Sequence, residues 1–241
     1  MITGTLINVA TVIAGGLLGT LLGNRLPEKM RNTVLHGLGL ITLTIGITMA
    51  IGTKNILIPL FSVLIGGILG ELLRIEDALE RVGKWSEARL GSLFGGDQNT
   101  FAQGFITASL VFCVGPMTIL GSIQDGLMGD YTLLAVKSLM DGFAAMALAA
   151  TLGAGVMLSA VTILVYQGLL SVAAGLFGAA LGGVTSETAW VVEMTATGGV
   201  VILSIAFILL DIKRIRAANL LPAVFIAPLI VLILGLLGVA Y

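Results

Sequence analysis

Long apolar runs, separated by short polar segments, extend along almost the whole chain. About 20 consecutive apolar residues are enough to cross a bilayer as an α-helix. By this criterion the pattern predicts helices at 2–23, 33–52, 56–74, 101–120, 131–151, 156–182, 190–211 and 218–240. The run 131–182 is divided at "TLGAG", residues 151–155, because it is too long for one crossing. The predicted fold class is all-α, a polytopic integral membrane protein with about eight transmembrane helices.

The composition supports a membrane protein and leaves little room for a soluble domain. The 241 residues are 57% hydrophobic and 10% charged, with a mean hydropathy of +1.10. Soluble domains average about 45–50% apolar and about 25% charged residues. We therefore expect one transmembrane domain over 1–241, with central helices at about 101–151.

The basic residues predict the orientation, because Lys and Arg near helix ends concentrate on the cytoplasmic side. They form three clusters: Arg25, Lys29 and Arg31; Arg74, Arg81, Lys84 and Arg89; Lys213, Arg214 and Arg216. Eight spans with the N-terminus outside place all three clusters inside, whereas seven spans would send the last cluster outward. The charges therefore favour eight spans with both termini outside.

The longest polar stretch, residues 74–92, has an amphipathic pattern. Ile75, Leu79 and Val82 share one helical face, Trp85 lies beside it, and charged residues cover the rest. The pattern is typical of a helix that lies on the inner membrane surface. A short cytoplasmic hairpin is the alternative.

Two parts of the sequence resemble each other. "VIAGGLLGTLLGNRLPE" at 12–28 matches "SVAAGLFGAALGGVTSE" at 171–187, and the same offset aligns Asn8 with Gln167. A first repeat at about 2–74 and a second at about 156–240 would have inverted topology, as in many secondary transporters. The alternative is that glycine-rich helices align by chance, since small residues serve helix packing in any membrane protein.

The stretch "FCVGPMTILGSIQDGLMGD", residues 112–130, interrupts the apolar pattern. Pro116 cannot donate a backbone hydrogen bond, and Gly115 and Gly121 weaken the same segment. We expect a helix break near Gly115–Pro116. The broken helix either lines a water-filled cavity, which we favour, or kinks and ends in an outer loop.

The next predicted helix carries two charges inside the membrane. Lys137 and Asp141 are four residues apart and therefore share a face. A charge at the centre of a membrane helix costs at least about 2.5–3.5 kcal/mol on insertion scales, so such residues usually pair or face a cavity. Asp141 is too short to reach the interface, and we expect it to be the central functional residue. The alternative is an ion pair that only holds helices together.

The expected substrate or ion pathway combines these residues with further polar side chains in the helices. Its candidate residues are Gln124, Asp125, Lys137, Ser138, Asp141, Glu193, Asn8 and Gln167. His36 is expected at the inner interface as an ordinary polar residue. No metal-ligand cluster or nucleophile motif accompanies the acids, so we expect no metal site, no cofactor and no enzyme activity.

The motifs "GPMTILGSIQDG" and "LAVKSLMDGFAAMALA", with the N-terminal "GTLINVATVIAGGLLG", resemble the bacterial inner-membrane family of YdfK and YqgA. The resemblance runs along essentially the full length. It implies a small polytopic protein of the bacterial plasma membrane. The family is classified as a domain of unknown function, so the resemblance implies no substrate.

These patterns predict a secondary transporter or channel for an ion or small polar solute. The expected partners are the lipid bilayer and that solute, with a homo-oligomer left open as the assembly and no nucleic acid. The second hypothesis is a non-transporting membrane scaffold or sensor, with segment 74–92 docking a cytoplasmic partner.

The topology can be tested by labelling single cysteines in intact cells. Ser86→Cys is expected to resist a membrane-impermeant thiol reagent until the cells are opened, because it lies in the predicted cytoplasmic segment. A cysteine at position 241 is the matched outer control and should label at once. Strong labelling of Ser86→Cys in intact cells would contradict the orientation.

Overall fold

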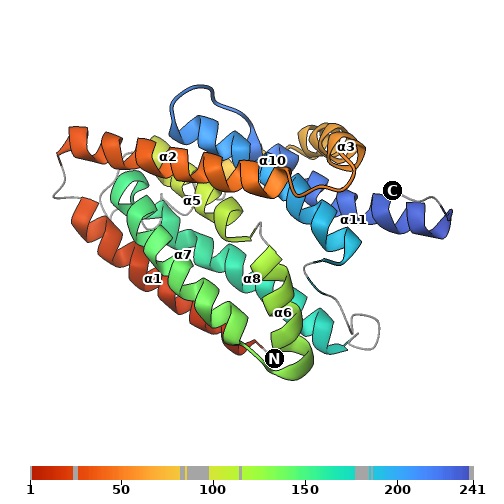
Figure 1. The fold of residues 1–241 in the computed structure, drawn as a ribbon. Helices are drawn as coiled ribbons and strands as arrows, with labels where there is room; N and C mark the ends of the chain where they lie inside the picture. The colour runs from red at the N-terminus through yellow and green to blue at the C-terminus, as the bar shows by residue number, and fades with distance from the viewer. Residues whose placement is uncertain are drawn as a thin grey trace. The chain divides into compact units, whose positions relative to one another are not determined.

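The computed structural model describes residues 2–23, 27–81, 85, 98–113, 116–176, 185 and 187–238, and only the backbone of 28, 31, 98, 99 and 116. All regular elements within these residues are helices, so the all-α fold class is confirmed (Figure 1). The elements are α1 (Thr3–Gly23), α2 (Glu28–Ala50), α3 (Leu57–Leu73), α5 (Gln98–Cys113), α6 (Pro116–Met128), α7 (Thr132–Leu152), α8 (Gly155–Leu176), α10 (Ala189–Leu209), the 3-10 helix η1 (Ala217–Leu220) and α11 (Leu221–Leu236).

Six of the described helices are long and apolar enough to cross a membrane, and counting two bent helix pairs as one span each raises the number to eight. One pair is Leu57–Leu73 with Ile75–Arg81, bent by 49°, and the other joins α5 to α6. The predicted single helix at 101–120 is wrong in its extent. The chain is interrupted before Pro116, and the second helix then continues to Met128.

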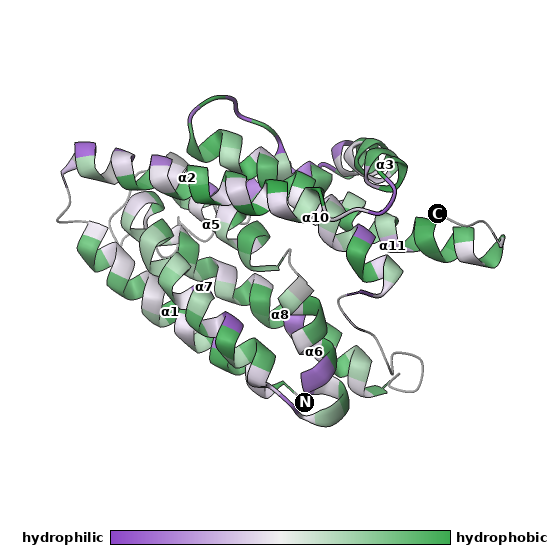
Figure 2. Cartoon of the chain, viewed as in Figure 1, coloured by the Kyte–Doolittle hydropathy of each residue, from purple (hydrophilic) through white to green (hydrophobic). Residues whose placement is uncertain are grey.

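The large apolar side chains on the outside of the helices fit a lipid environment. Leu72, Phe143 and Leu236 are 74%, 70% and 88% exposed. Figure 2 shows that hydrophobic residues make up most of each helix, with hydrophilic ones in connecting segments and at intervals within the helices. Soluble proteins rarely expose so much apolar surface, because water penalises it.

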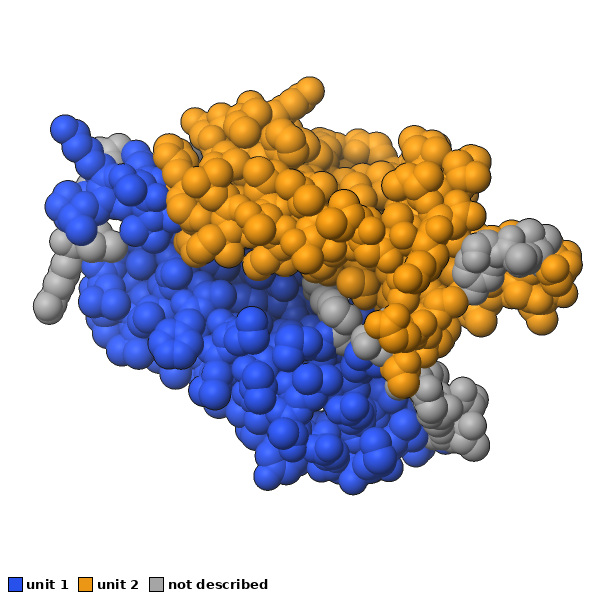
Figure 3. All heavy atoms as spheres, viewed as in Figure 1, with its two compact units in different colours: residues 1–35, 80–184 blue, residues 36–79, 185–241 orange. Residues whose placement is uncertain are grey.

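The described chain divides into two compact units, which are described separately (Figure 3). Unit 1 comprises 1–35 and 80–184, and unit 2 comprises 36–79 and 185–241. The prediction of a single transmembrane domain stays a prediction. Unit 1 contains α1, α5, α6, α7 and α8, together with the start of α2.

In unit 1, α1 and α7 pack side by side at very short range and run in the same direction. A Cβ atom on Gly15 would lie 2.1 Å from the carbonyl oxygen of Gly142, and one on Gly19 would lie 2.1 Å from that of Met146. Both partners advance by four residues, so the two helices are parallel. Only glycine permits this approach, which is how membrane helices gain van der Waals contact.

The helix α8 packs against α1 in the opposite direction. Gly16 lies against the side chain of Met157, whereas Asn8, two turns earlier, hydrogen-bonds Gln167. The residue numbers of the contacts decrease along α8 as they increase along α1, so the two helices are antiparallel. The polar side chains near the start of α1 consequently meet those near the end of α8.

Unit 2 pairs α3 with α11 and the second part of α2 with α10. A Cβ on Gly66 would lie 2.4 Å from the backbone nitrogen of Ala223, and one on Gly70 would lie 1.9 Å from the carbonyl oxygen of Asn219. These partner numbers also run in opposite directions, so α3 and α11 are antiparallel. Ile58 packs with Ala227 and Val231 in the core of this pair.

The pair α2 and α10 repeats the antiparallel arrangement. Gly39 lies against Leu210, and Gly46 lies against Leu203. Contacts further along α2 are therefore made with earlier residues of α10. In each of the two helix pairs of unit 2, the helices are antiparallel and meet at glycines.

The predicted amphipathic segment 74–92 is described only in part. Arg74 adopts a left-handed conformation, with φ 51°, and Ile75–Arg81 is helical. Glu76 does not lie on a solvated face. It is 7% exposed, its backbone nitrogen donates to Asn219 Oδ1 at 2.8 Å, and its carboxylate accepts from the backbone nitrogen of Ala218 at 3.1 Å. Residues 82–84 and 86–92 lie outside the described part.

The close α1–α7 contact leads to a stability prediction. Gly19→Ala should lower the free energy of unfolding by about 1–3 kcal/mol, because the added methyl group collides with the α7 backbone. Gly168→Ala is the matched control, since among the described residues no atom beyond its own stretch of helix lies within 4 Å of its Cβ position. Thermal unfolding of both variants in detergent tests the contact. Equal midpoints for the two would contradict it.

Candidate functional site

The site begins at the interruption between α5 and α6 in unit 1. The helical segments Thr100–Cys113 and Met117–Met128 meet at 63°. Pro116 starts α6 and lacks the N–H that would have bonded the carbonyl of Phe112, four residues earlier. The predicted break falls here, although Gly115 itself lies outside the described residues.

The carbonyl of Phe112 is satisfied by a side chain. The hydroxyl of Thr118 donates to this carbonyl oxygen at 3.0 Å, and both residues are fully buried. The carbonyl at the break therefore has a protein partner, and the water-filled cavity expected beside the broken helix stays a prediction. The hydroxyl reaches back across the break because the two helices turn sharply.

Gly121 does not break the helix. It lies inside α6, and the side chain of Leu134 on α7 packs where a Cβ would otherwise stand, 2.8 Å away. The residue therefore serves close packing between α6 and α7. Its expected role in a helix break is wrong because α6 is regular through this position.

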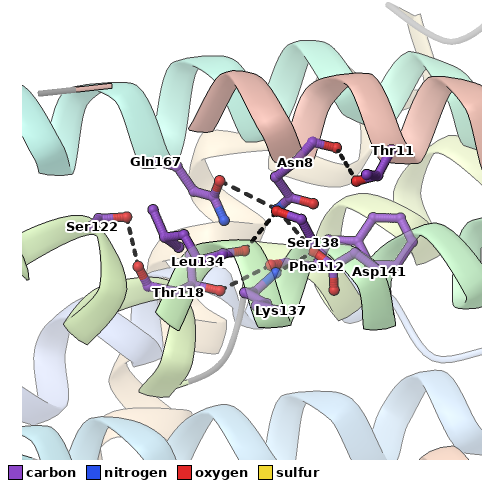
Figure 4. A network of polar contacts seen from close by, with 10 residues as sticks. All are labelled: Asn8, Thr11, Phe112, Thr118, Ser122, Leu134, Lys137, Ser138, Asp141 and Gln167. Atoms are coloured by element: carbon purple, nitrogen blue, oxygen red, sulfur yellow. Dashed lines mark hydrogen bonds and ion pairs between the residues drawn. The ribbon is translucent and has the colours of Figure 1, made fainter. Parts of the chain in front are cut away.

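Asp141 lies at the centre of a buried polar cluster between α1, α7 and α8 (Figure 4). Its Oδ2 atom accepts hydrogen bonds from Lys137 Nζ, one turn earlier on α7, and from Asn8 Nδ2 on α1 at 2.9 Å. The side chains of Lys137 and Asp141 are only 8% and 11% exposed. The charges therefore neutralise each other away from solvent. We call Asn8, Lys137, Asp141 and Gln167 the Asp141 cluster.

Asn8 links the ion pair to α8. Its Nδ2 atom also donates to Gln167 Oε1 at 3.3 Å, and both amides are fully buried. Figure 4 shows the Asn8 and Gln167 side chains directed toward each other between the two helices. Within the described part of the chain, Asn8 Oδ1 and Gln167 Nε2 have no hydrogen-bond partner. The cluster thus retains one open acceptor and one open donor.

Asp125 lies near the start of α1. Its Oδ2 atom accepts from the backbone nitrogen of Gly4 at 3.0 Å, and the residue is fully buried. A carboxylate at a helix N-terminus is stabilised by the unpaired N–H groups and the helix dipole. Asp125 therefore contacts α1 at Gly4, one helical turn before Asn8.

Two other predicted residues lie near this region without joining the cluster. Ser138 is fully buried, but its hydroxyl donates to the carbonyl of Leu134 at 2.6 Å within α7. Gln124 is half-buried on α6, and among the described residues no hydrogen bond connects it to Asp141. Their participation in a pathway stays a prediction.

Glu193 belongs to unit 2, where it binds the segment between α2 and α3. Its carboxylate accepts from the Thr53 hydroxyl at 2.6 Å and from the backbone nitrogens of Lys54 and Asn55 at 2.8 and 3.3 Å. The side chain is 1% exposed. These contacts give Glu193 an anchoring role, and its place in a pathway stays a prediction.

Two buried hydroxyl residues, Thr5 and Ser171, lie outside the set of predicted pathway residues. Both are fully buried, and neither hydroxyl has a hydrogen-bond partner among the residues that the structure describes. Helical spacing could have identified them, since Thr5 lies three residues before Asn8 and Ser171 lies four after Gln167. Each therefore extends the polar face of its helix by one turn.

Comparison with known proteins agrees with the resemblance seen in the sequence. The chain is 28% identical over 243 residues to the "Uncharacterized membrane protein YdfK" of Bacillus subtilis (strain 168), covering 99% of each chain. It is 29% identical over 232 residues to the "Uncharacterized protein YqgA" of Escherichia coli (strain K12), covering 94% of this chain and 95% of the relative. No solved structure matches. The family model "Protein of unknown function (DUF554)" matches residues 3–232, and the chain therefore belongs to this family.

Proposed function

We propose that this membrane protein is a secondary transporter or channel for an ion or small polar solute, with a pathway through unit 1 past Asp141. The observation that carries the proposal is the Asp141 cluster. It combines a buried ion pair with two buried amides, and each amide retains an unpartnered polar atom. Buried unpaired polar groups each cost about 1–3 kcal/mol, so their presence calls for a functional reason.

The alternative, an ion pair that only holds helices together, accounts for less of this arrangement. A purely structural polar network is most stable when every donor and acceptor is paired. The ion pair of Lys137 and Asp141 already neutralises the two charges without Asn8 or Gln167. The two amides widen the network to α8 and add unpaired groups, which favours a binding role over packing alone.

The interruption between α5 and α6 supports the same function. Secondary transporters often bind their substrates where membrane helices are discontinuous, because interrupted backbone supplies polar groups at membrane depth. Here α6 carries Asp125 and packs against both α7 and α8. The interrupted helix thus contributes a carboxylate to the same unit that holds Asp141.

The helix directions in unit 1 support a topology of eight spans. If each of α1, α2 and α3 crosses once, α7 can run parallel to α1 only when α5 and α6 together make one further crossing. A re-entrant α5–α6 pair would make α7 antiparallel to α1. The parallel glycine contacts of these two helices therefore favour a single broken crossing. With the positive charges inside, both termini lie outside a bacterial plasma membrane.

The antiparallel helix pairs support an inverted repeat. Helices α1, α2 and α3 of the first copy correspond to α8, α10 and α11 of the second, and each contacts its counterpart in the opposite direction within its own unit. A two-fold axis in the membrane plane relates helices in this way. Asn8 and Gln167, which the sequence repeat aligns, are hydrogen-bonded to each other, as expected for residues at such an axis.

The proposal is tested by flux in proteoliposomes that contain the purified protein, with sodium, potassium, chloride and small zwitterions as trial solutes. Asp141→Asn should reduce the flux of the transported solute at least about tenfold, because a charge is lost where the pathway is buried. The yield of folded protein should fall much less. Asp130→Asn is the matched control, since this carboxylate is exposed between α6 and α7.

Two outcomes would count against transport. Equal losses of flux and folded protein in Asp141→Asn would mean that the acid only holds helices together. Absence of flux for every trial solute in the wild-type protein would favour the scaffold or sensor instead.

A further inference from the structure

We propose that unit 1 contains a subsite for a monovalent alkali cation, formed by Asp125 on α6, Thr5 on α1 and Ser171 on α8. The subsite gives a substrate class to the transport function proposed above and rests on that function for its role in transport. Its existence as a binding site can be tested separately. We call these three residues the Asp125 layer.

The three helices meet at the Asp125 layer. Asp125 Oδ2 is 3.0 Å from the backbone nitrogen of Gly4, which immediately precedes Thr5. The next residue on α6, Gly126, is so close to α8 that a Cβ there would lie 2.1 Å from the carbonyl oxygen of Ser171. The segment Asp125–Gly126 therefore contacts α1 beside Thr5 and α8 at Ser171.

The antiparallel crossing of α1 and α8 brings the two hydroxyl residues to the same level. Asn8 is hydrogen-bonded to Gln167, and moving back three residues on α1 corresponds to moving forward along α8. Thr5 therefore comes opposite the turn that contains Ser171. Each also lies on the face of its helix that carries the amide, because residues three or four apart are neighbours on a helix.

The two hydroxyls differ from most other buried hydroxyls of unit 1, whereas Ser62 and Thr197 of unit 2 are also buried without a partner among the described residues. Ser122, Ser138 and Ser159 each donate to a carbonyl three or four residues earlier in their own helix, which is the usual arrangement for serine in a helix. Thr5 Oγ1 and Ser171 Oγ make no such bond, although both residues are 0% exposed. Their oxygen atoms are therefore available to a ligand between the helices.

The chemistry of these groups selects a monovalent hard cation. Carboxylate and hydroxyl oxygens suit hard cations, whereas transition metals prefer imidazole or thiolate ligands. Among the described residues, no three His, Cys, Asp or Glu side chains gather into a group that could hold a metal ion. Divalent Ca²⁺ and Mg²⁺ require several carboxylate ligands or a retained water shell, whereas the Asp125 layer offers one carboxylate and two neutral hydroxyls, which suits a monovalent ion.

The Asp125 layer adjoins the Asp141 cluster along the same helix crossing. Thr5 and Asn8 are three residues apart on α1, and Ser171 and Gln167 are four apart on α8. A cation that leaves the Asp125 layer therefore meets the unpartnered carbonyl oxygen Asn8 Oδ1 one turn further on. The Asp125 layer and the Asp141 cluster therefore follow one another along the crossing of α1 and α8 in unit 1.

Cation-dependent stability of the purified full-length protein tests the subsite. The thermal unfolding midpoint is measured against increasing NaCl, KCl or LiCl, with N-methyl-D-glucamine chloride keeping the ionic strength constant. At least one alkali cation should raise the midpoint in a saturable way, because a ligand that binds only the folded state stabilises it. N-methyl-D-glucamine is too large for the site and should have no such effect.

Three substitutions locate the effect. Thr5→Val and Ser171→Ala remove one oxygen each with little change in size, and each should raise the half-saturating cation concentration about tenfold or more. Ser159→Ala is the matched control on α8, since the Ser159 hydroxyl is bonded within its own helix at 2.6 Å. Its half-saturating concentration should equal that of the wild-type protein.

The subsite is overturned if all salts stabilise the protein equally, or if Thr5→Val and Ser171→Ala bind the cation as tightly as Ser159→Ala does. Loss of the buried Asp125 charge can prevent folding, so Asp125→Asn tests the subsite only if the variant folds. The test therefore relies on Thr5→Val and Ser171→Ala. Flux measurements separate the two proposals. Cation-specific stabilisation without flux would reject transport and keep the subsite, whereas Asp141-dependent flux without cation-specific stabilisation would reject the subsite alone.

Discussion

The ion pair between Lys137 and Asp141 is the interaction on which the interior of unit 1 depends. Either charge alone would be costly inside a membrane helix, and their spacing of four residues lets them neutralise each other within α7. Asn8 reaches Asp141 because α1 packs against α7 at glycine contacts, as at Gly15 and Gly142. The close approach of these helices and the burial of the charges are therefore parts of one arrangement.

The interruption between α5 and α6 is accommodated by the same part of the molecule. A break inside a membrane protein must not leave backbone groups without partners, because lipid supplies none. The Thr118 hydroxyl satisfies the Phe112 carbonyl, so the break needs no water at that point. The change of direction also lets α6 present Asp125 to the first turn of α1 and pack Gly126 against α8. The break thus repositions a carboxylate while the Phe112 carbonyl keeps a hydrogen-bond partner.

Several buried side-chain atoms of unit 1, by contrast, have no hydrogen-bond partner among the described residues. Most buried hydroxyls bond their own helix, whereas Thr5, Asn8, Gln167 and Ser171 keep polar atoms without partners along one helix crossing. A protein that binds and releases a solute needs such groups, because a fully paired interior would gain nothing from a ligand. Their concentration between α1 and α8 is the strongest physical argument for a binding function here.

The sequence by itself determined the properties that depend on neighbouring residues. Helix positions follow from local apolar length, the break from Pro116, and the Lys137–Asp141 pair from a spacing of one turn. The tertiary structure alone decided how polar residues from different helices are partnered. It placed Asn8 beside Asp141, used Glu193 to hold the segment between α2 and α3, and left Thr5 and Ser171 unpaired. These outcomes depend on which helix faces meet and in which direction the helices run, and no local pattern encodes that information.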